Sequence, residues 1–105
     1  MQIDELTEEL FTEQLNTKFY VPFEDRRVEL ELVGVEGDKS SMEKIEGVER
    51  FVIYFQGPGD FYLPQYTYRL EHEALGTLEI FMVPVGRDKN GFRYEAIFSR
   101  MTDKG

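Results

Sequence analysis

Apolar residues recur along this 105-residue chain with two different spacings. Positions 6, 10, 11 and 15 are all Leu or Phe, a spacing that places apolar side chains on one face of a helix. From Val28 to Leu32 apolar and charged residues alternate instead, which is typical of a strand with one buried face and one solvent-facing side. The pattern predicts a short amphipathic helix over about residues 7–15, followed by strands.

The limits of the helix are also visible in the sequence. Thr7 can cap the helix through its hydroxyl oxygen, and the acidic residues Glu8 and Glu9 suit the positive end of the helix dipole. We expect the helix to stop at Asn16.

Further strand segments are rich in aromatic and β-branched residues and are separated by turn residues, at 18–21, 50–56, 66–72, 77–84 and 92–98. The segment 50–56 is almost continuously apolar, which predicts a central strand covered on both faces. A short connection between 66–72 and 77–84 predicts one hairpin, and Asn90-Gly91 before the last strand predicts another. Gly34 suggests a bulge or bend after the alternating strand.

Residues 36–49 are charged and bounded by glycines, which predicts a mobile loop, and Met42, Ile45 and Val48 leave room for one helical turn within it. About six strands with short connections favour antiparallel pairing over βαβ units. We predict a mainly β single domain over residues 1–105. It would be a small antiparallel barrel or sandwich with one short N-terminal α-helix, a strand-rich body over 18–99 and a tail over 100–105.

Charge and composition narrow the possible partners. Twelve basic and 21 acidic residues give a formal net charge of −9, which repels nucleic-acid phosphates and anionic lipid headgroups. The chain has no cysteine, no basic and apolar leader at its beginning, and no run of about 18 apolar residues. We expect no nucleic-acid partner, no membrane association and a cytoplasmic location.

No pattern of catalytic or metal-binding residues is recognisable. His72 is the single histidine, and zinc usually requires several His or Cys ligands. No segment has the spaced carboxylates of a calcium loop. A turn-stabilising role for His72, bonded to nearby backbone, is favoured over acid–base catalysis, which would need a serine and an acid close to it in space. We expect no enzyme activity, catalytic residue, cofactor or metal.

The segment 60–66 combines aromatic residues with a proline between two strands. Its candidate interaction residues are Phe61, Tyr62, Leu63 and Tyr66. Exposed aromatic residues on a rigid scaffold are typical of protein-interface hot spots. The alternative is that Phe61, Tyr62 and Leu63 fold back and plug one end of a barrel.

Two runs carry a family resemblance, namely Leu-Pro-Gln-Tyr-Thr-Tyr-Arg-Leu-Glu-His-Glu-Ala-Leu-Gly at residues 63–76 and Tyr-Glu-Ala-Ile-Phe at residues 94–98. The chain resembles a family of short bacterial proteins known only as a domain of unknown function, with Tyr66 where a glycine is usual and Glu73 where a proline is usual. Both departures affect turns. The resemblance implies no catalytic residues and suggests a link to phage-tail-like systems.

The leading hypothesis is a small non-enzymatic protein-interaction or assembly accessory module that uses the aromatic loop and an acidic rim. Its partner would be another protein, and a homo-oligomer is compatible with an exposed aromatic loop. The alternative is a small-molecule-binding β-barrel with a pocket in its mouth. The candidate pocket residues are Tyr68, Arg69 and Tyr94.

Overall fold

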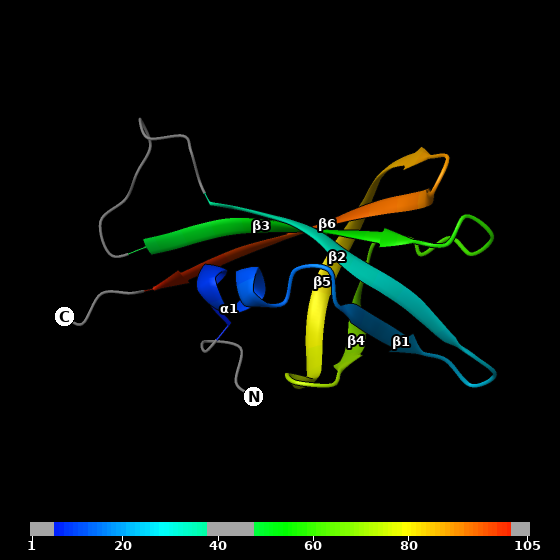
Figure 1. The fold of residues 1–105 in the computed structure, drawn as a ribbon, viewed down its shortest axis with the longest axis horizontal. Coiled ribbons are helices and arrows are strands. Elements are labelled where there is room, and N and C mark those ends of the chain that lie inside the picture. The colour runs from blue at the N-terminus through cyan, green and yellow to red at the C-terminus, as the bar shows by residue number, and fades with distance from the viewer. Residues whose placement is uncertain (1–5, 38–47, 102–105) are drawn as a thin grey trace.

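Six antiparallel strands form a closed barrel in the computed structural model, which describes residues 6–37 and 48–101 (Figure 1). The strands are β1 (Lys18–Pro22), β2 (Arg27–Gly37), β3 (Val48–Gly57), β4 (Tyr66–His72), β5 (Gly76–Asp88) and β6 (Gly91–Met101). Their order around the barrel is β1-β2-β3-β6-β5-β4, and each paired neighbour is antiparallel. The predicted fold class is confirmed, with the barrel rather than the sandwich.

The N-terminal helix α1 (Glu8–Glu13) is shorter than the predicted 7–15. Thr7 caps it as expected, since its hydroxyl oxygen accepts the N–H of Leu10 at 3.1 Å. Asn16 has a φ of 70°, and its N–H donates to the carbonyl oxygen of Leu32 at 2.7 Å. The bond to β2 turns the chain away from the helical path.

Several strands extend further than predicted. β2 runs to Gly37 and β3 begins at Val48, so strands take both ends of the predicted 36–49 loop. The remainder, including the helical turn considered at Met42 and Ile45, lies outside the described residues. β6 runs through residue 101 and includes the start of the predicted tail. β5 continues past Pro84, where the register with β6 shifts, and such an irregularity accommodates a residue that has no N–H to donate.

Gly34 lies at a bulge, as its position in the sequence suggested. The register between β2 and β3 shifts between Leu32 and Gly34. A Cβ at Gly34 would lie 3.2 Å from the Tyr54 ring, closer than ordinary van der Waals contact. The missing side chain therefore lets β3 approach the bulged strand.

β3 is covered on one face only, which corrects the prediction of a strand buried on both. Phe51, Ile53 and Phe55 point into the core, while the residues between them are half-buried on the outer face. A closed barrel has a single interior, so alternate residues of every strand must face outward. The near-continuous apolar run in the sequence thus supplies both the core and the outer wall.

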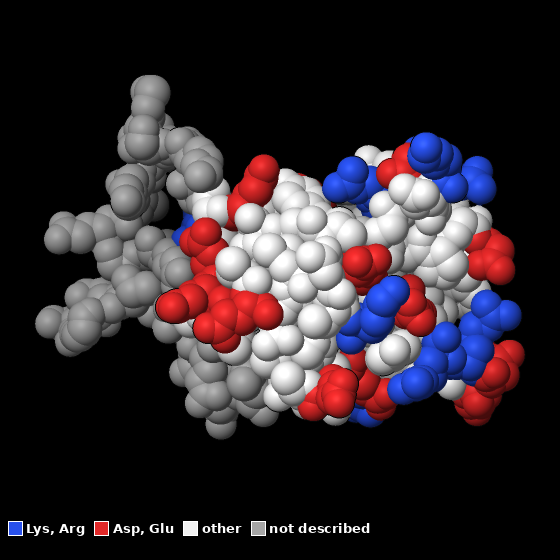
Figure 2. Space-filling model, in the orientation of Figure 1, with Lys and Arg blue, Asp and Glu red and all other residues white. Residues whose placement is uncertain are grey.

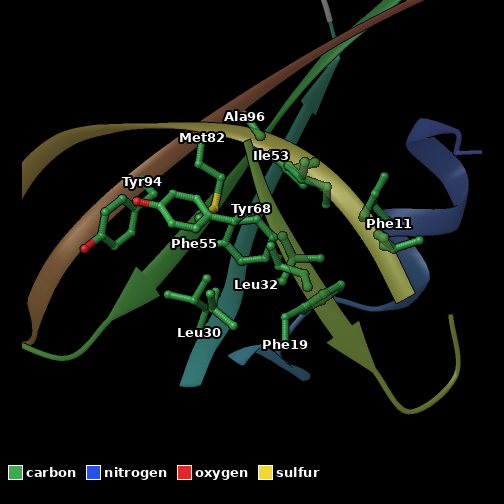
Figure 3. Packing of buried hydrophobic residues seen from close by; sticks show 14 of the residues in the cluster. Phe11, Phe19, Leu30, Leu32, Ile53, Phe55, Tyr68, Met82, Tyr94 and Ala96 are labelled. Carbon is green, nitrogen blue, oxygen red and sulfur yellow. The ribbon is translucent and has the colours of Figure 1, made fainter. Parts of the chain in front are cut away.

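The two ends of the barrel are closed differently. The helix end carries α1, the linker 14–17 and the β4–β5 turn at 73–75, and the loop end carries the connections 23–26, 58–65 and 89–90 (Figure 1). At the helix end the ring of Phe11 packs against Phe51 and Phe98, with centroids 5.9 and 5.3 Å away. Figure 3 shows Phe11 beside α1 on one side of the core and Tyr94 on the opposite side.

Candidate functional site

Two pairs of aromatic rings at the loop end each join the β3–β4 connection to another hairpin. Phe61, from the β3–β4 connection, lies 5.4 Å from Phe23 of the β1–β2 connection. Tyr62 packs edge-on against Phe92 at the start of β6, with ring centroids 5.2 Å apart. The connection that carries the predicted loop is therefore held from both sides by aromatic contacts.

An arginine stacks on each of these ring pairs. The guanidinium carbon of Arg26 lies 4.8 Å from the centroid of Phe61. That of Arg87 lies 5.2 Å from the centroid of Phe92. Together these six side chains form what we call the aromatic–arginine surface: Phe23, Arg26, Phe61, Tyr62, Arg87 and Phe92.

Two tyrosine hydroxyls inside the barrel fasten the loop to the core. The hydroxyl oxygen of Tyr94 accepts the N–H of Leu63 at 3.0 Å, and the Tyr68 hydroxyl donates to the carbonyl oxygen of Pro64. Figure 3 shows both hydroxyls directed away from Phe11, toward the loop end. We call this pair of bonds the tyrosine latch.

Both latch tyrosines keep their hydroxyl proton at neutral pH. Burial raises the pKa of the Tyr94 hydroxyl above its ordinary value of 10.0, while the bond from the Leu63 backbone acts in the opposite direction. Burial also raises the pKa of Tyr68.

Gly57 makes room for the latch, because a Cβ there would lie 3.1 Å from the Tyr94 ring and 2.8 Å from Leu30.

The four predicted interaction residues fall into two groups. Leu63 is 1% exposed and plugs the barrel, and Phe61 is half-buried against Phe23. Tyr62 and Tyr66 are 52% and 65% exposed. The segment therefore supplies both the plug and exposed aromatic side chains, which the sequence treated as alternatives.

The rim around the loop is mixed in charge, which corrects the expected acidic rim. Acidic side chains also lie at this end, at Glu24 and Asp25 beside Arg26, at Asp60 in the β3–β4 connection and at Asp88 next to Arg87 at the end of β5. In Figure 2 most of the visible blue lies on the half of the molecule that carries the loop end, interspersed with red. The net charge of the chain thus does not describe this surface.

The three predicted pocket residues do not line one cavity. Tyr68 and Tyr94 point into the barrel, where they belong to the hydrophobic core. Arg69 follows Tyr68 on β4 and is exposed on the outer wall. Alternation along the strand separates Arg69 from the two tyrosines.

The core fills the barrel between the plug and the helix. Figure 3 shows the labelled side chains packed against one another across the interior. The buried side chains below 2% exposure include Phe19, Leu30, Leu32, Ile53, Phe55, Leu70 and Ile80. Packed side chains therefore occupy the space that the predicted pocket would need.

His72 stabilises the β4–β5 turn at the helix end, as predicted. Its Nδ1 accepts the N–H groups of Ala74 and Leu75 at 3.0 and 3.1 Å, and its Nε2 lies 2.9 Å from the hydroxyl of Thr17. The Thr17 hydroxyl uses its own proton to donate to the carbonyl oxygen of Gln14. The contact between Thr17 and His72 therefore has Nε2–H as the donor and the Thr17 oxygen as the acceptor. Both ring nitrogens of His72 are thus used in structural bonds.

A shallow groove of about 610 Å³ lies on the outer wall, across β1, β2 and the end of β3. Lys18, the basic residue of its lining, lies 2.8 Å from Glu29 and 3.9 Å from Glu31. Its charge is neutralised within the groove itself, and we assign the groove no function.

Within residues 6–37 and 48–101 no group of three or more His, Cys, Asp or Glu side chains is arranged to hold a metal ion. The one helix there, α1, is too short to cross a membrane.

Four residues of the aromatic–arginine surface were not predicted from the sequence: Phe23, Arg26, Arg87 and Phe92. A signal for them existed, because successive connections of an antiparallel barrel alternate between its two ends. The first, third and fifth connections must therefore share an end. What the sequence could not show is which of their side chains stack on one another.

Comparison with curated proteins and with solved structures found no match. A family model matches residues 6–98, a range that contains the plug, the latch and all six residues of the aromatic–arginine surface. This chain therefore belongs to the family described as Domain of unknown function (DUF6916).

Proposed function

We propose that this protein is a small non-enzymatic interaction module that binds another protein through its loop end. The observation that supports this most directly is the 52% exposure of Tyr62 on a loop that the tyrosine latch and Leu63 fasten to the core. Tyrosine and arginine are enriched among the residues that dominate protein–protein affinity.

The rigid support matters as much as the exposed rings. A side chain that is already held in place loses less conformational freedom on binding than one on a free loop. Phe61 and Tyr62 each pack against a ring from another connection, at 5.4 and 5.2 Å. The surface is thus preorganised for a partner.

The small-molecule-binding barrel has less support, since Tyr68 and Tyr94 are both engaged with the loop backbone and core side chains occupy the interior. The link to phage-tail-like systems has the family resemblance as its support. A role in assembly would use the same loop end.

The test is affinity capture from the source organism with tagged protein, followed by mass spectrometry. The variant is Phe61→Ala with Tyr62→Ala, and the matched control is Phe81→Ala with Ile97→Ala. Phe81 and Ile97 are 50% and 66% exposed on the barrel wall, so the control removes comparable apolar surface elsewhere.

We expect a partner that is recovered with the wild-type chain and the wall variant and lost with the loop variant. The loop variant should remain folded at the temperature of the capture, because Leu63 and both latch bonds are kept, and the loss of the half-buried Phe61 ring should lower its unfolding temperature. Recovery of the same partner by the loop variant would overturn the proposal.

A further inference from the structure

The stacked arginines combine a ring contact with the absence of an ion pair, which they share with Arg69, Lys89 and Arg93 of the described residues. Lys18 pairs with two glutamates, and Arg27 lies 3.9 Å from a Glu71 oxygen. Within residues 6–37 and 48–101, Arg26 and Arg87 form no ion pair, although the chain has 21 acidic residues. Their charges are thus not neutralised by a carboxylate of the described structure.

The ring contacts hold both guanidinium groups in a defined position. A guanidinium that stacks on an aromatic face keeps the N–H donors at its edge available, and those donors match a carboxylate in a bidentate arrangement. One N–H of Arg87 reaches the carbonyl oxygen of Gly59 at 3.5 Å, which is a long contact and leaves its other donors open.

We propose that the aromatic–arginine surface binds an acidic protein segment that carries an apolar or aromatic residue between its carboxylates. This inference rests on the proposed function and specifies the partner of the same surface. Carboxylates of the segment pair with Arg26 and Arg87, and its apolar residue packs against the exposed ring of Tyr62.

The charges around the surface favour carboxylates over a nucleic acid. A phosphate backbone presents a continuous line of negative charge and would meet Asp25 and Asp60 in the connections and Asp88 at the end of β5. An acidic segment with a few carboxylates can pair with two arginines and avoid these residues.

The experiment is an NMR titration of the ¹⁵N-labelled full chain with a synthetic peptide of alternating Glu and Phe. A peptide of alternating Lys and Phe is the control for apolar contact, and a thymidine oligonucleotide is the control for phosphate. The variant is Arg26→Gln with Arg87→Gln, which keeps polar side chains and removes both charges. Arg69→Gln, on the exposed outer wall, is its matched control.

We expect the Glu-Phe peptide to shift the Phe61, Tyr62 and Arg87 resonances saturably, with an affinity that falls as salt rises. The double variant should bind about tenfold more weakly, and Arg69→Gln should bind as the wild type does. Equal binding of the two peptides, unchanged binding by the double variant, no saturable shift, or tighter binding of the oligonucleotide would overturn the inference.

The two proposals fail separately. If capture depends on Phe61 and Tyr62 while the acidic peptide does not bind, the interaction module stands and the acidic partner is wrong. If the loop variant captures the same partner as the wild type, the proposed function itself is wrong.

Discussion

At the helix end of the barrel, Phe11 is fully buried against Phe51 and Phe98, whereas at the loop end Phe61 and Tyr62 remain partly exposed and only Leu63 enters the core. The helix end is thus closed by apolar burial. The loop end is closed by two tyrosine hydroxyls that bond to backbone atoms.

This difference separates two tasks in one small domain. Apolar burial stabilises the fold most when rings are completely removed from water. Hydrogen bonds can fasten a loop while its rings stay outside, available to a partner. On this account, substitutions at the helix end reduce stability, and substitutions of the exposed rings at the loop end reduce binding.

The largest expected effect on stability is at the helix end. Phe11→Ala should lower the free energy of unfolding by about 3–5 kcal/mol, because it removes a fully buried ring and leaves a cavity. Urea denaturation followed by circular dichroism measures this loss. Phe81→Ala, which truncates a half-exposed ring, should cost less than about 1 kcal/mol. Equal costs for the two variants would contradict the role assigned to α1.

A smaller effect is expected at the latch. Tyr94→Phe leaves the buried N–H of Leu63 without its acceptor and should cost about 1–3 kcal/mol. Hydrogen exchange at the Leu63 amide should become faster than in the wild type. Tyr54→Phe is the control, because its hydroxyl makes an exposed 3.3 Å contact with Glu36, and it should be nearly neutral. Unchanged exchange at Leu63 would show that the latch does not hold the loop.

A further test concerns pH and the helix end. Burial lowers the pKa of His72 below its ordinary value of 6.5, with Glu73 acting in the opposite direction. The neutral ring is the form that accepts the two backbone N–H groups, so its contribution is present above about pH 6.5 and is lost as the pH falls through the lowered pKa.

The unfolding free energy of the wild type should therefore fall between pH 7 and pH 5 by about 1 kcal/mol more than that of His72→Asn. Asparagine can accept a nearby backbone N–H and does not titrate in this range. Parallel pH profiles for the two proteins would show that His72 has no such role. Capture by the loop end should be the same in both proteins at pH 7.

The barrel was predictable from the chain because its signals are local. Alternation in β2, the cap at Thr7, the bulge at Gly34 and the glycine that begins β6 each depend on residues close in sequence. At Gly91 both the turn and the packing require glycine. Its φ is 126°, and a Cβ there would lie 2.0 Å from the carbonyl oxygen of Gly57.

The site was only half predictable because its contacts are not local. Aromatic residues at 61, 62 and 66 could be recognised, but the contacts of Arg26 with Phe61 and of Tyr62 with Phe92 join segments far apart in the chain. Arg87, in contrast, stacks on its cross-strand partner in the β5–β6 hairpin. Tyr68 and Tyr94 were predicted to line a pocket, whereas their hydroxyls bond to the backbone of the aromatic loop. Side-chain pairings of this kind depend on the barrel register, which composition does not reveal.

Site-specific photocrosslinking in the source organism tests the division between the two ends most directly. A photoreactive phenylalanine would replace Tyr62 at the loop end, Thr12 on the exposed side of α1, or Phe81 on the barrel wall. The account predicts a crosslinked partner at position 62 and none at positions 12 and 81. A partner crosslinked at position 12 or 81 and absent at position 62 would contradict it.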